Sequence, residues 1–342
     1  MKKSSAIFHN LLLVLLLCAM TGCGREEAVY SRTGLYFDTA ISVSLYADAA
    51  DKTRCEDVLN LVMEKCAFYE NMLSPTTEES DVYRINHAGG EWTTVSDETV
   101  SLLYTALNYC DMTDGRIDVT ISPVKALWSF TPENDGVTLP DQTQLKEALS
   151  HVDYRKVEIN GNKVRLSDPQ AAIDLGFIAK GFIADELKAL LIQEGIENAL
   201  IDLGGNILVL GEKPDGNAFR IGIQKPFADK GEYVTVVEAK DSSANGKSAC
   251  NTVVTSGIYE RYCEIDGTIY HHILDAHTGY PADTHLASVT ILTNSGVNAD
   301  ALSTTCMVMG LDWSVELLTS LDGVDAIFIT EDGRLIDTRT SS

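Results

Sequence analysis

The stretch 270–304 constrains this chain more strongly than any other part of the sequence. It contains four of the seven histidines, at His271, His272, His277 and His285. Two strand-like runs, 270–274 and 286–293, bracket a loop rich in turn-forming residues. A pattern typical of a helix start follows the second run. The stretch therefore predicts two strands, a polar loop and a helix that converge on one place.

The helix start predicts a metal site. Asn298 can cap the helix, and Asp300 falls in the first turn, where a carboxylate suits the positive helix end. Asp300 and Thr304 are four residues apart and share one helix face. Their oxygens, with nearby carbonyls, suit Mg²⁺, and His272 and Asp275 would approach from the preceding loop. Spacing alone leaves open a second interpretation, with a capping aspartate, a buried threonine and structural histidines.

The remaining pattern predicts an α+β fold with mostly antiparallel sheets. Apolar residues step by three and four in the helical segments and alternate in the strands. Helices are expected at 51–73, 96–112, 141–152, 178–194, 298–309 and 312–321. Strands are expected at 33–47, 171–175, 199–210, 219–224, 233–239, 250–255, 259–265 and 324–330, with a hairpin at 156–166. Hairpin-linked strands dominate, which disfavours a doubly wound parallel sheet.

The N-terminus resembles a lipoprotein signal. Two lysines precede a short leucine-rich core, which is too short to be a stable spanning helix. The core ends in Thr-Gly before Cys23, and this pattern resembles a bacterial lipobox. We expect cleavage before Cys23, a lipid on its thiol and a place on the extracytoplasmic face of the cell membrane. The alternative is an ordinary signal followed by a chance cysteine. The predicted organisation is a signal at 1–22, a tether at 23–32 and one domain at 33–342.

Charge and cysteine usage exclude several classes of function. The formal net charge is −24, which argues against nucleic acid and against attachment to a membrane by a basic surface. A phosphorylated ligand would need a local cation or metal. The cysteines after Cys23 are dispersed, with no CxxC pair, so a disulfide scaffold and a cysteine-bound zinc are both disfavoured.

Three further segments are compatible with phosphate or ligand binding. Segment 174–181 is a strand–turn–helix junction in which N–H groups and Lys180 could hold a phosphate. Segment 202–206 places two glycines within a strand, where a ligand or another backbone could approach closely. Segment 255–261 offers hydroxyls, a glycine and Arg261. Each segment has a structural alternative: a tight turn, close packing or a surface ion pair.

Together these segments resemble one family, the FAD:protein FMN transferases of the ApbE family, once described as thiamine-biosynthesis lipoproteins. The resemblance runs from about residue 37 to 329, nearly the whole mature chain. Its blocks are ENMLSPTTEESDVYRIN (70–86), DGRIDVTISPVKALWSF (114–130), 173–211 with DLGFIAKG and DLGGN, TSGIYER (255–261), HILDAHTGYP (272–281) and DALSTTCMVMG (300–310).

The resemblance implies a reaction and its components. FAD would be cleaved at its diphosphate, AMP would leave, and FMN would be esterified to a threonine of a target protein. Mg²⁺ is the implied metal. The implied acceptors are subunits of membrane redox pumps or extracellular electron-transfer proteins. The rival interpretations are an FAD pyrophosphatase, which gives FMN and AMP, and a lipoprotein that binds FAD without catalysis.

The resemblance also assigns residues. The implied metal ligands are Asp300, Thr304 and the main-chain carbonyl of Phe177, with Ser303 standing where some members have a second acid. The implied base is His272. The implied FAD contacts are Phe37, Arg116, Ile117, Asp118, Asp174, Lys180 and Leu274.

Three positions depart from the family pattern. Asp38 stands within Phe-Asp-Thr where Met-Gly-Thr is usual, and could alter how the isoalloxazine is held. Thr76 replaces an aromatic that often packs on the flavin. His277 stands where arginine is commoner, and a histidine is mostly uncharged at neutral pH.

Overall fold

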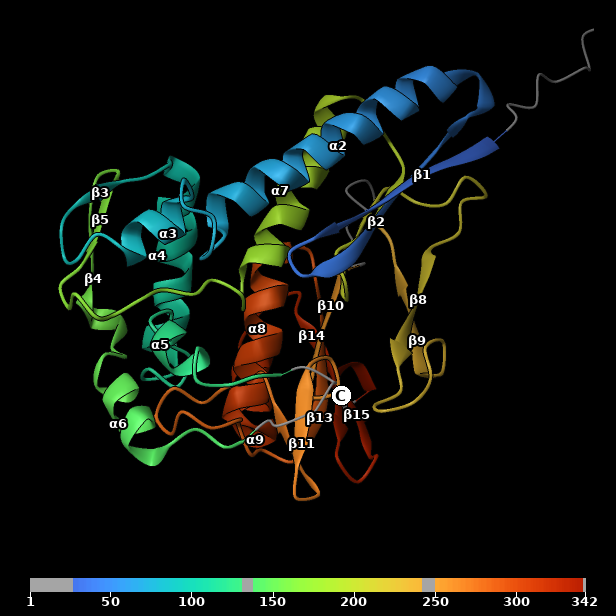
Figure 1. Ribbon diagram of the computed structural model, residues 1–342. Helices are drawn as coiled ribbons and strands as arrows, with labels where there is room; N and C mark the ends of the chain where they lie inside the picture. Colours follow the sequence, from blue (N-terminus) through green and yellow to red (C-terminus); the bar gives the residue numbers. More distant parts are fainter. Residues whose placement is uncertain (1–26, 131–137, 242–249, 341–342) are drawn as a thin grey trace, which may run out of the picture.

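The dominant element is an eight-stranded antiparallel sheet (Figure 1). The computed structural model describes residues 27–130, 138–241 and 250–340. The predicted signal and Cys23 lie outside the described residues. The strand order in the sheet is β1-β2-β6-β7-β10-β13-β14-β15. The strands are β1 Glu27–Tyr36, β2 Thr39–Asp48, β6 Ala199–Asp202, β7 Asn206–Leu210, β10 Thr252–Gly257, β13 Leu286–Thr293, β14 Asp325–Thr330 and β15 Leu335–Asp337.

The first strand corrects the predicted tether. Residues 27–32, assigned to the tether from sequence, form the first part of β1, which pairs with β2 along its whole length. Phe37 and Asp38 make the two-residue turn, and both have a positive φ of 56°. Such a turn normally takes asparagine or glycine, so the backbone here is strained.

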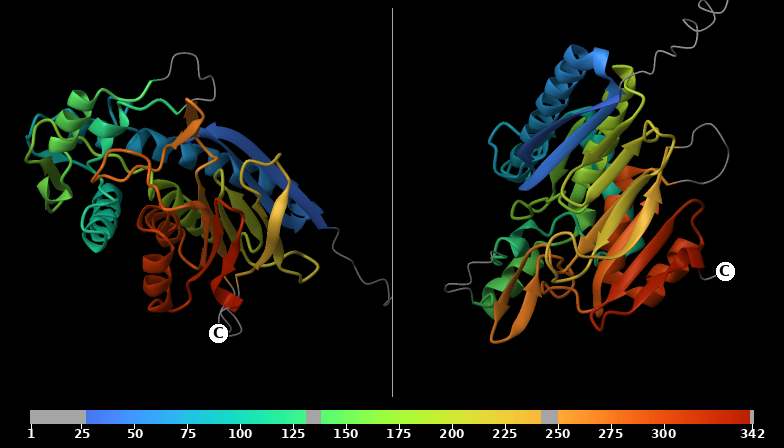
Figure 2. Two further views of the ribbon diagram at one scale, coloured as in Figure 1. Left: turned by 90° about the horizontal axis from the view of Figure 1, so that it is seen from below. Right: turned by 90° about the vertical axis from the view of Figure 1, so that its right-hand side faces the viewer.

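Helices cover one face of the sheet and a hairpin covers the other (Figures 1 and 2). The helices are α2 Lys52–Leu73, α7 Ala179–Gln193 and α8 Gly296–Met309. The hairpin consists of β8 Phe219–Gln224 and β9 Tyr233–Ala239. Every residue of the central strand β13 is buried, because side chains on both of its faces are covered.

A smaller helical region flanks this core, at the left of Figure 1. It contains α3 Asp81–Asn86, α4 Asp97–Met112, α5 Ser122–Lys125, α6 Gln142–Ser150 and the small sheet of β3 Thr93–Thr94, β5 Lys163–Leu166 and β4 Val157–Asn160. The remaining elements are β11 Tyr262–Ile265, β12 Thr268–His271, α9 Leu311–Thr319 and the 3-10 turns Ala49–Asp51, Tyr154–Lys156 and Thr338–Thr340. The architecture confirms the α+β prediction.

Several predicted elements need correction. The strand expected at 33–47 is divided between β1 and β2, and the strand run expected at 270–274 ends at His271 as β12. Residues 171–175 are not a strand, because the Asn86 side chain bonds both the N–H and the carbonyl of Ile173 in place of a neighbouring strand. Helix α8 begins at Gly296, two residues before the expected start. Its cap is Ser295, and the Asp185 carboxylate of α7 accepts the next two N–H groups, so Asn298 is not the cap.

Within the described ranges, no helix is long and apolar enough to cross a membrane. The six cysteines after Cys23 are all unpaired, as expected, at Cys55, Cys66, Cys110, Cys250, Cys263 and Cys306. Burial raises the pKa of the Cys66 thiol to about 12, which keeps it protonated and unreactive.

Candidate functional site

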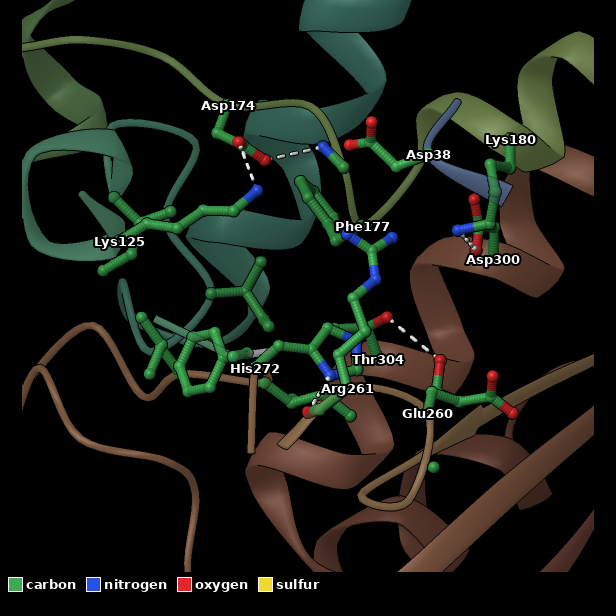
Figure 3. A pocket seen from close by; sticks show the side chains of 18 of the residues that line it. Asp38, Lys125, Asp174, Phe177, Lys180, Glu260, Arg261, His272, Asp300 and Thr304 are labelled. Atoms are coloured by element: carbon green, nitrogen blue, oxygen red, sulfur yellow. Dashed lines mark hydrogen bonds and ion pairs between the residues drawn. The ribbon is translucent and has the colours of Figure 1, made fainter. Parts of the chain in front are cut away.

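A cavity of about 460 Å³ lies where the start of α7, the face of α8, the end of β10 and the loop after β12 meet (Figure 3). Nine of the residues proposed from sequence line it: Ile117, Asp118, Asp174, Phe177, Lys180, His272, Leu274, Asp300 and Thr304. The segments that carry them are far apart in sequence. The fold therefore brings most of the predicted site together.

Asp300 is the most buried acid of the cavity, with 3% of its surface exposed. Its carboxylate accepts hydrogen bonds from the Gly181 N–H at 2.9 Å and the Asn206 side-chain amide at 3.3 Å. The Lys180 ammonium lies 4.0 Å from the same group. Burial raises the pKa of Asp300, and these partners oppose the rise. The expectation that Asp300 lies in the first turn of its helix is wrong, because α8 starts earlier, at Gly296, and packs against α7.

Close contact between α7 and α8 requires glycine. A Cβ on Gly181 would lie 2.1 Å from the Gly296 carbonyl oxygen and 2.6 Å from the Asp300 Cβ. Only a residue without a side chain lets the Gly181 N–H reach the carboxylate. The glycine that ends the segment 174–181 thus serves helix packing and orients Asp300.

Hydroxyl groups extend this cluster along α8. Thr304 lines the cavity, and its Oγ1 lies 3.2 Å from the Ser256 Oγ of β10. Ser303 is fully buried behind it and does not line the cavity. The Ser303 hydroxyl donates to the Asp300 carbonyl oxygen at 2.9 Å. Ser303, which was expected as a metal ligand, is therefore not placed to reach a metal in the cavity.

Two further acids of the cavity, Asp174 and Asp118, hold loops in place. Asp174 accepts from the Lys125 ammonium at 2.6 Å and from the Gly176 N–H at 2.8 Å. Burial alone would raise the pKa of Asp174, but the Lys125 charge and these hydrogen bonds hold it below its usual value. Asp118 accepts from Thr120 and from the Tyr154 N–H, so its oxygens brace the loop.

Arg116 differs from its expected role. Its guanidinium donates two hydrogen bonds to Asp275, at 2.9 and 2.7 Å, and it does not line the cavity. Asp275, which was expected to approach Asp300 and Thr304 together with His272, is held by Arg116 and does not line the cavity. His277, at the arginine position of the family, donates to the Asp114 carbonyl at 2.9 Å outside the cavity.

At the β1–β2 turn, Asp38 lines the cavity, whereas Phe37 does not. The Phe37 N–H donates to the Glu70 carboxylate of α2 at 2.8 Å, which pins the strained turn. Thr76 also lies outside the cavity. Of the departures from the family pattern, Asp38 is the one that reaches the site.

His272 presents one ring nitrogen to the cavity. Its Nδ1 lies 3.1 Å from the Arg261 carbonyl oxygen, which can only accept, so Nδ1 carries the proton and Nε2 is the acceptor. Burial, reinforced by the Arg261 charge, lowers the pKa of His272 to about 3. His271 points to the opposite side and bonds backbone with both nitrogens. The geometry thus favours His272 over His271 as a base.

The cavity also contains polar residues that were not among the predicted site residues. Arg261, which the sequence had singled out within the segment 255–261, lines it, and so does Glu260 of the same segment. Lys125 lines it too, although its partner Asp174 is 49 residues away and no local pattern reveals the pair. Ser256 lines it as well. Figure 3 shows Lys125, Glu260 and Arg261 around the same opening as Lys180 and Asp300.

The donor set fits a small hard cation. Asp300 and Thr304 present oxygens to the cavity, beside Phe177, whose carbonyl is the third implied ligand. The buried Oδ1 of Asn206, next to Asp300, has no protein hydrogen-bond partner, which leaves an oxygen acceptor unsatisfied there. No cluster of three or more His, Cys, Asp or Glu that could hold a metal occurs in the described part of the chain. A metal at Asp300 would therefore depend on hydroxyl and carbonyl oxygens, which suits Mg²⁺ rather than zinc.

These features define the class of protein: an α+β protein with one cavity that gathers acids, cations, hydroxyl groups and a histidine. Comparison with known proteins identifies the family. The ApbE family model matches residues 37–328. The FAD:protein FMN transferase of Treponema pallidum is 34% identical over 97% of this chain and 94% of its own length. The chain belongs to the ApbE family.

Solved structures agree with this assignment. The crystal structure of the ApbE protein of Thermotoga maritima superposes with a TM-score of 0.80 at 31% identity, covering 92% of this chain and 98% of that chain. The apo flavinyl transferase ApbE of Pseudomonas stutzeri gives 0.75 at 28% identity, covering 91% and 94%. The similarity extends over essentially the whole domain.

Proposed function

We propose that this chain transfers FMN from FAD to a threonine hydroxyl of a target protein and releases AMP, in a reaction that depends on Mg²⁺. The observation that carries the proposal is the convergence of Asp300, Thr304, Lys180, Arg261 and His272 on one cavity within an ApbE fold. A cavity with these groups suits a diphosphate whose charge must be neutralised locally, because the chain as a whole is strongly acidic.

The proposed step is attack by the threonine oxygen on the phosphorus next to the flavin. A new P–O bond forms, the diphosphate P–O bond breaks, and AMP leaves with the bridging oxygen. His272 Nε2 takes the threonine proton, because Nδ1 is already committed to the Arg261 carbonyl. The negative diphosphate of bound FAD would raise the low pKa of His272 and make it a stronger base.

Cationic side chains would hold the diphosphate. Lys180 and Arg261 both line the cavity. Asp300, Thr304 and the Phe177 carbonyl would hold the metal, which when bound supplies positive charge to the phosphate oxygens in the transition state. Flavin contacts are proposed for Ile117 and Leu274, which offer apolar surface in the same cavity.

Transfer to protein is tested with purified protein, FAD, Mg²⁺ and an acceptor from the proposed classes, followed by in-gel flavin fluorescence and AMP quantification. We expect a fluorescent acceptor band and an equal amount of AMP, and both should disappear with EDTA or when the acceptor threonine is changed to valine. Release of AMP and FMN with no labelled band would instead establish an FAD pyrophosphatase. Bound FAD with no AMP would establish a binding protein.

We further propose that the protein is anchored by a lipid on Cys23 at the extracytoplasmic face of the cell membrane. The short leucine core followed by Thr-Gly-Cys supports this location. The proposed acceptors, subunits of membrane redox pumps or extracellular electron-transfer proteins, would be reached from the same face. Changing Cys23 to alanine should move the protein from the membrane to the soluble fraction or block its processing. An intact Met1 in the membrane-bound protein would contradict the proposal.

A further inference from the structure

Three hydroxyl groups form a connected chain beside the cavity. Ser256 at the end of β10 lies between two residues of α8, with its Oγ 2.7 Å from the Ser303 Oγ and 3.2 Å from the Thr304 Oγ1. The Ser303 hydroxyl also reaches the Asp300 carbonyl oxygen at 2.9 Å. Ser256 and Thr304 line the cavity, whereas Ser303 is fully buried.

The number of protons fixes the direction of the hydrogen bonds in this series of hydroxyl groups. Each hydroxyl has one proton, and the Asp300 carbonyl oxygen can only accept, so the Ser303 hydroxyl donates its proton to that oxygen. Ser303 must then accept from Ser256. Ser256, having donated, must accept from Thr304. The Thr304 proton is thereby directed toward Ser256, and the Thr304 lone pairs remain available to the cavity.

We propose that Ser256 is a positioning residue that orients the Thr304 hydroxyl for binding a divalent cation. A hydroxyl can coordinate a metal only through a lone pair, so its proton must point elsewhere. The direction of these hydrogen bonds is fixed at Ser303, because this residue is fully buried and its hydroxyl donates to the Asp300 carbonyl oxygen of the same helix. Ser303, at a position where some family members have an acid, thus acts through Ser256 and not as a ligand.

The position of Ser256 is itself fixed by the sheet. It pairs with Val289 on β13, and its neighbour Thr255 bonds Thr290 across the same two strands at 2.8 Å. Side chains that are held by rigid elements orient metal ligands better than side chains on loops, and loss of such outer partners typically weakens metal binding by about 10–100-fold. This inference rests on the proposed function, since it assumes a cation at Thr304.

The test measures Mg²⁺ binding to the full-length protein by calorimetry, in the absence of FAD, for four variants. Ser256→Ala should weaken Mg²⁺ binding by about 10-fold or more, and Thr304→Ala by at least as much. Ser303→Ala should weaken it less, because Ser256 keeps an acceptor site for the Thr304 proton. Ser44→Ala, which removes one hydroxyl of an exposed serine pair between β1 and β2, should bind Mg²⁺ as the wild type does.

The outcomes separate this inference from the proposed function. If Thr304→Ala weakens binding and Ser256→Ala does not, the positioning role is overturned while the cation site stands. If Thr304→Ala binds Mg²⁺ normally, the cation site and this inference both fail. Ser256→Cys, with a weaker donor and acceptor, should fall between wild type and alanine, and it provides the same comparison if the alanine variant does not fold.

Discussion

The polar cavity and an apolar groove both border the stretch around His271 and His272, and they differ in volume and in charge. The groove is the larger, about 920 Å³ against about 460 Å³, and is lined by the β8–β9 loop, the β11–β12 hairpin and the end of β14. His271 lines the groove and His272 lines the cavity. Neighbouring residues in extended backbone point to opposite sides, so one step along the chain changes the environment completely.

The proposed site is the smaller hollow, and it is set apart by its concentrated charge and not by its volume. Five acids and three cations line the smaller cavity: Asp38, Asp118, Asp174, Glu260, Asp300, Lys125, Lys180 and Arg261. The groove carries Lys225, Asp283 and Glu331, with side chains 58%, 85% and 51% exposed. Burying charge is costly, and proteins concentrate buried charge where chemistry requires it.

The largest expected effect separates the two histidines. His272→Asn retains shape and hydrogen bonding but cannot act as a base, so single-turnover transfer to protein should fall by about 10²–10⁴-fold, with FAD binding largely kept. His271→Asn should leave the rate nearly unchanged, because His271 bonds only backbone. Rates are measured across pH 5.5–8.5 at saturating FAD. A normal rate for His272→Asn with a large loss for His271→Asn would reverse the assignment.

Asp300→Asn should have the next largest effect. The change removes the one buried carboxylate beside Thr304, and loss of a single group that stabilises transition-state charge typically costs about 10²–10³-fold. AMP release at limiting Mg²⁺ is the measurement. Asp283→Asn in the groove is the matched control and should retain full activity. Full activity of Asp300→Asn at low Mg²⁺ would place the cation elsewhere.

A substitution in the groove should barely affect the flavin. Ile269 is 39% exposed and lines the groove but not the cavity. Ile269→Ser should leave FAD affinity within about two-fold of wild type, since surface changes rarely exceed about 0.5 kcal/mol. Quenching of flavin fluorescence gives the affinity. A loss of ten-fold or more would show that FAD occupies the groove.

The smallest expected effect is on stability as pH falls. Burial lowers the pKa of His271 to about 4 and that of His272 to about 3, from 6.5. Between pH 6.5 and about 4, the unfolded chain therefore binds protons that the folded protein does not. The free energy of unfolding consequently decreases as the pH is lowered through this range. Each ring contributes at most about 1.4 kcal/mol per pH unit.

Urea unfolding at several pH values measures this slope. Comparison of wild type with His271→Asn removes the contribution of the carboxylates that the two proteins share. The slope of the variant should be shallower over this range. Identical slopes for wild type and variant would mean that the His271 ring takes up its proton over this pH range in the folded protein as it does in the unfolded protein.

Local pattern predicted much of this fold. Strand β13 begins and ends where its apolar run predicts, and the N-caps Ser96 and Asp141 hold helices where expected. Such features depend on neighbours in sequence, where periodicity and capping chemistry act directly. The site residues came mainly from the family resemblance, and most of the residues that it implied line the cavity.

What the sequence did not predict depends on distant partners. Asp185 of α7 holds the first two N–H groups of α8, which begins two residues earlier than expected, and Asp300 is therefore buried beyond the first turn. Arg116 holds Asp275 from 159 residues away, and Asp275 does not line the cavity. Residues 27–32 become a strand because β2 offers them a partner edge. Pairings of this kind are set by tertiary structure, which local propensity does not encode.

The most direct test of this account is the position of the cation and the flavin diphosphate in crystals grown with FAD and Mn²⁺, with Mn²⁺ located by its anomalous signal. The account predicts a Mn²⁺ peak bonded to the Asp300 carboxylate and the Thr304 hydroxyl, with the diphosphate beside it and facing His272. A peak distant from Asp300, or a flavin bound in the apolar groove, would contradict it.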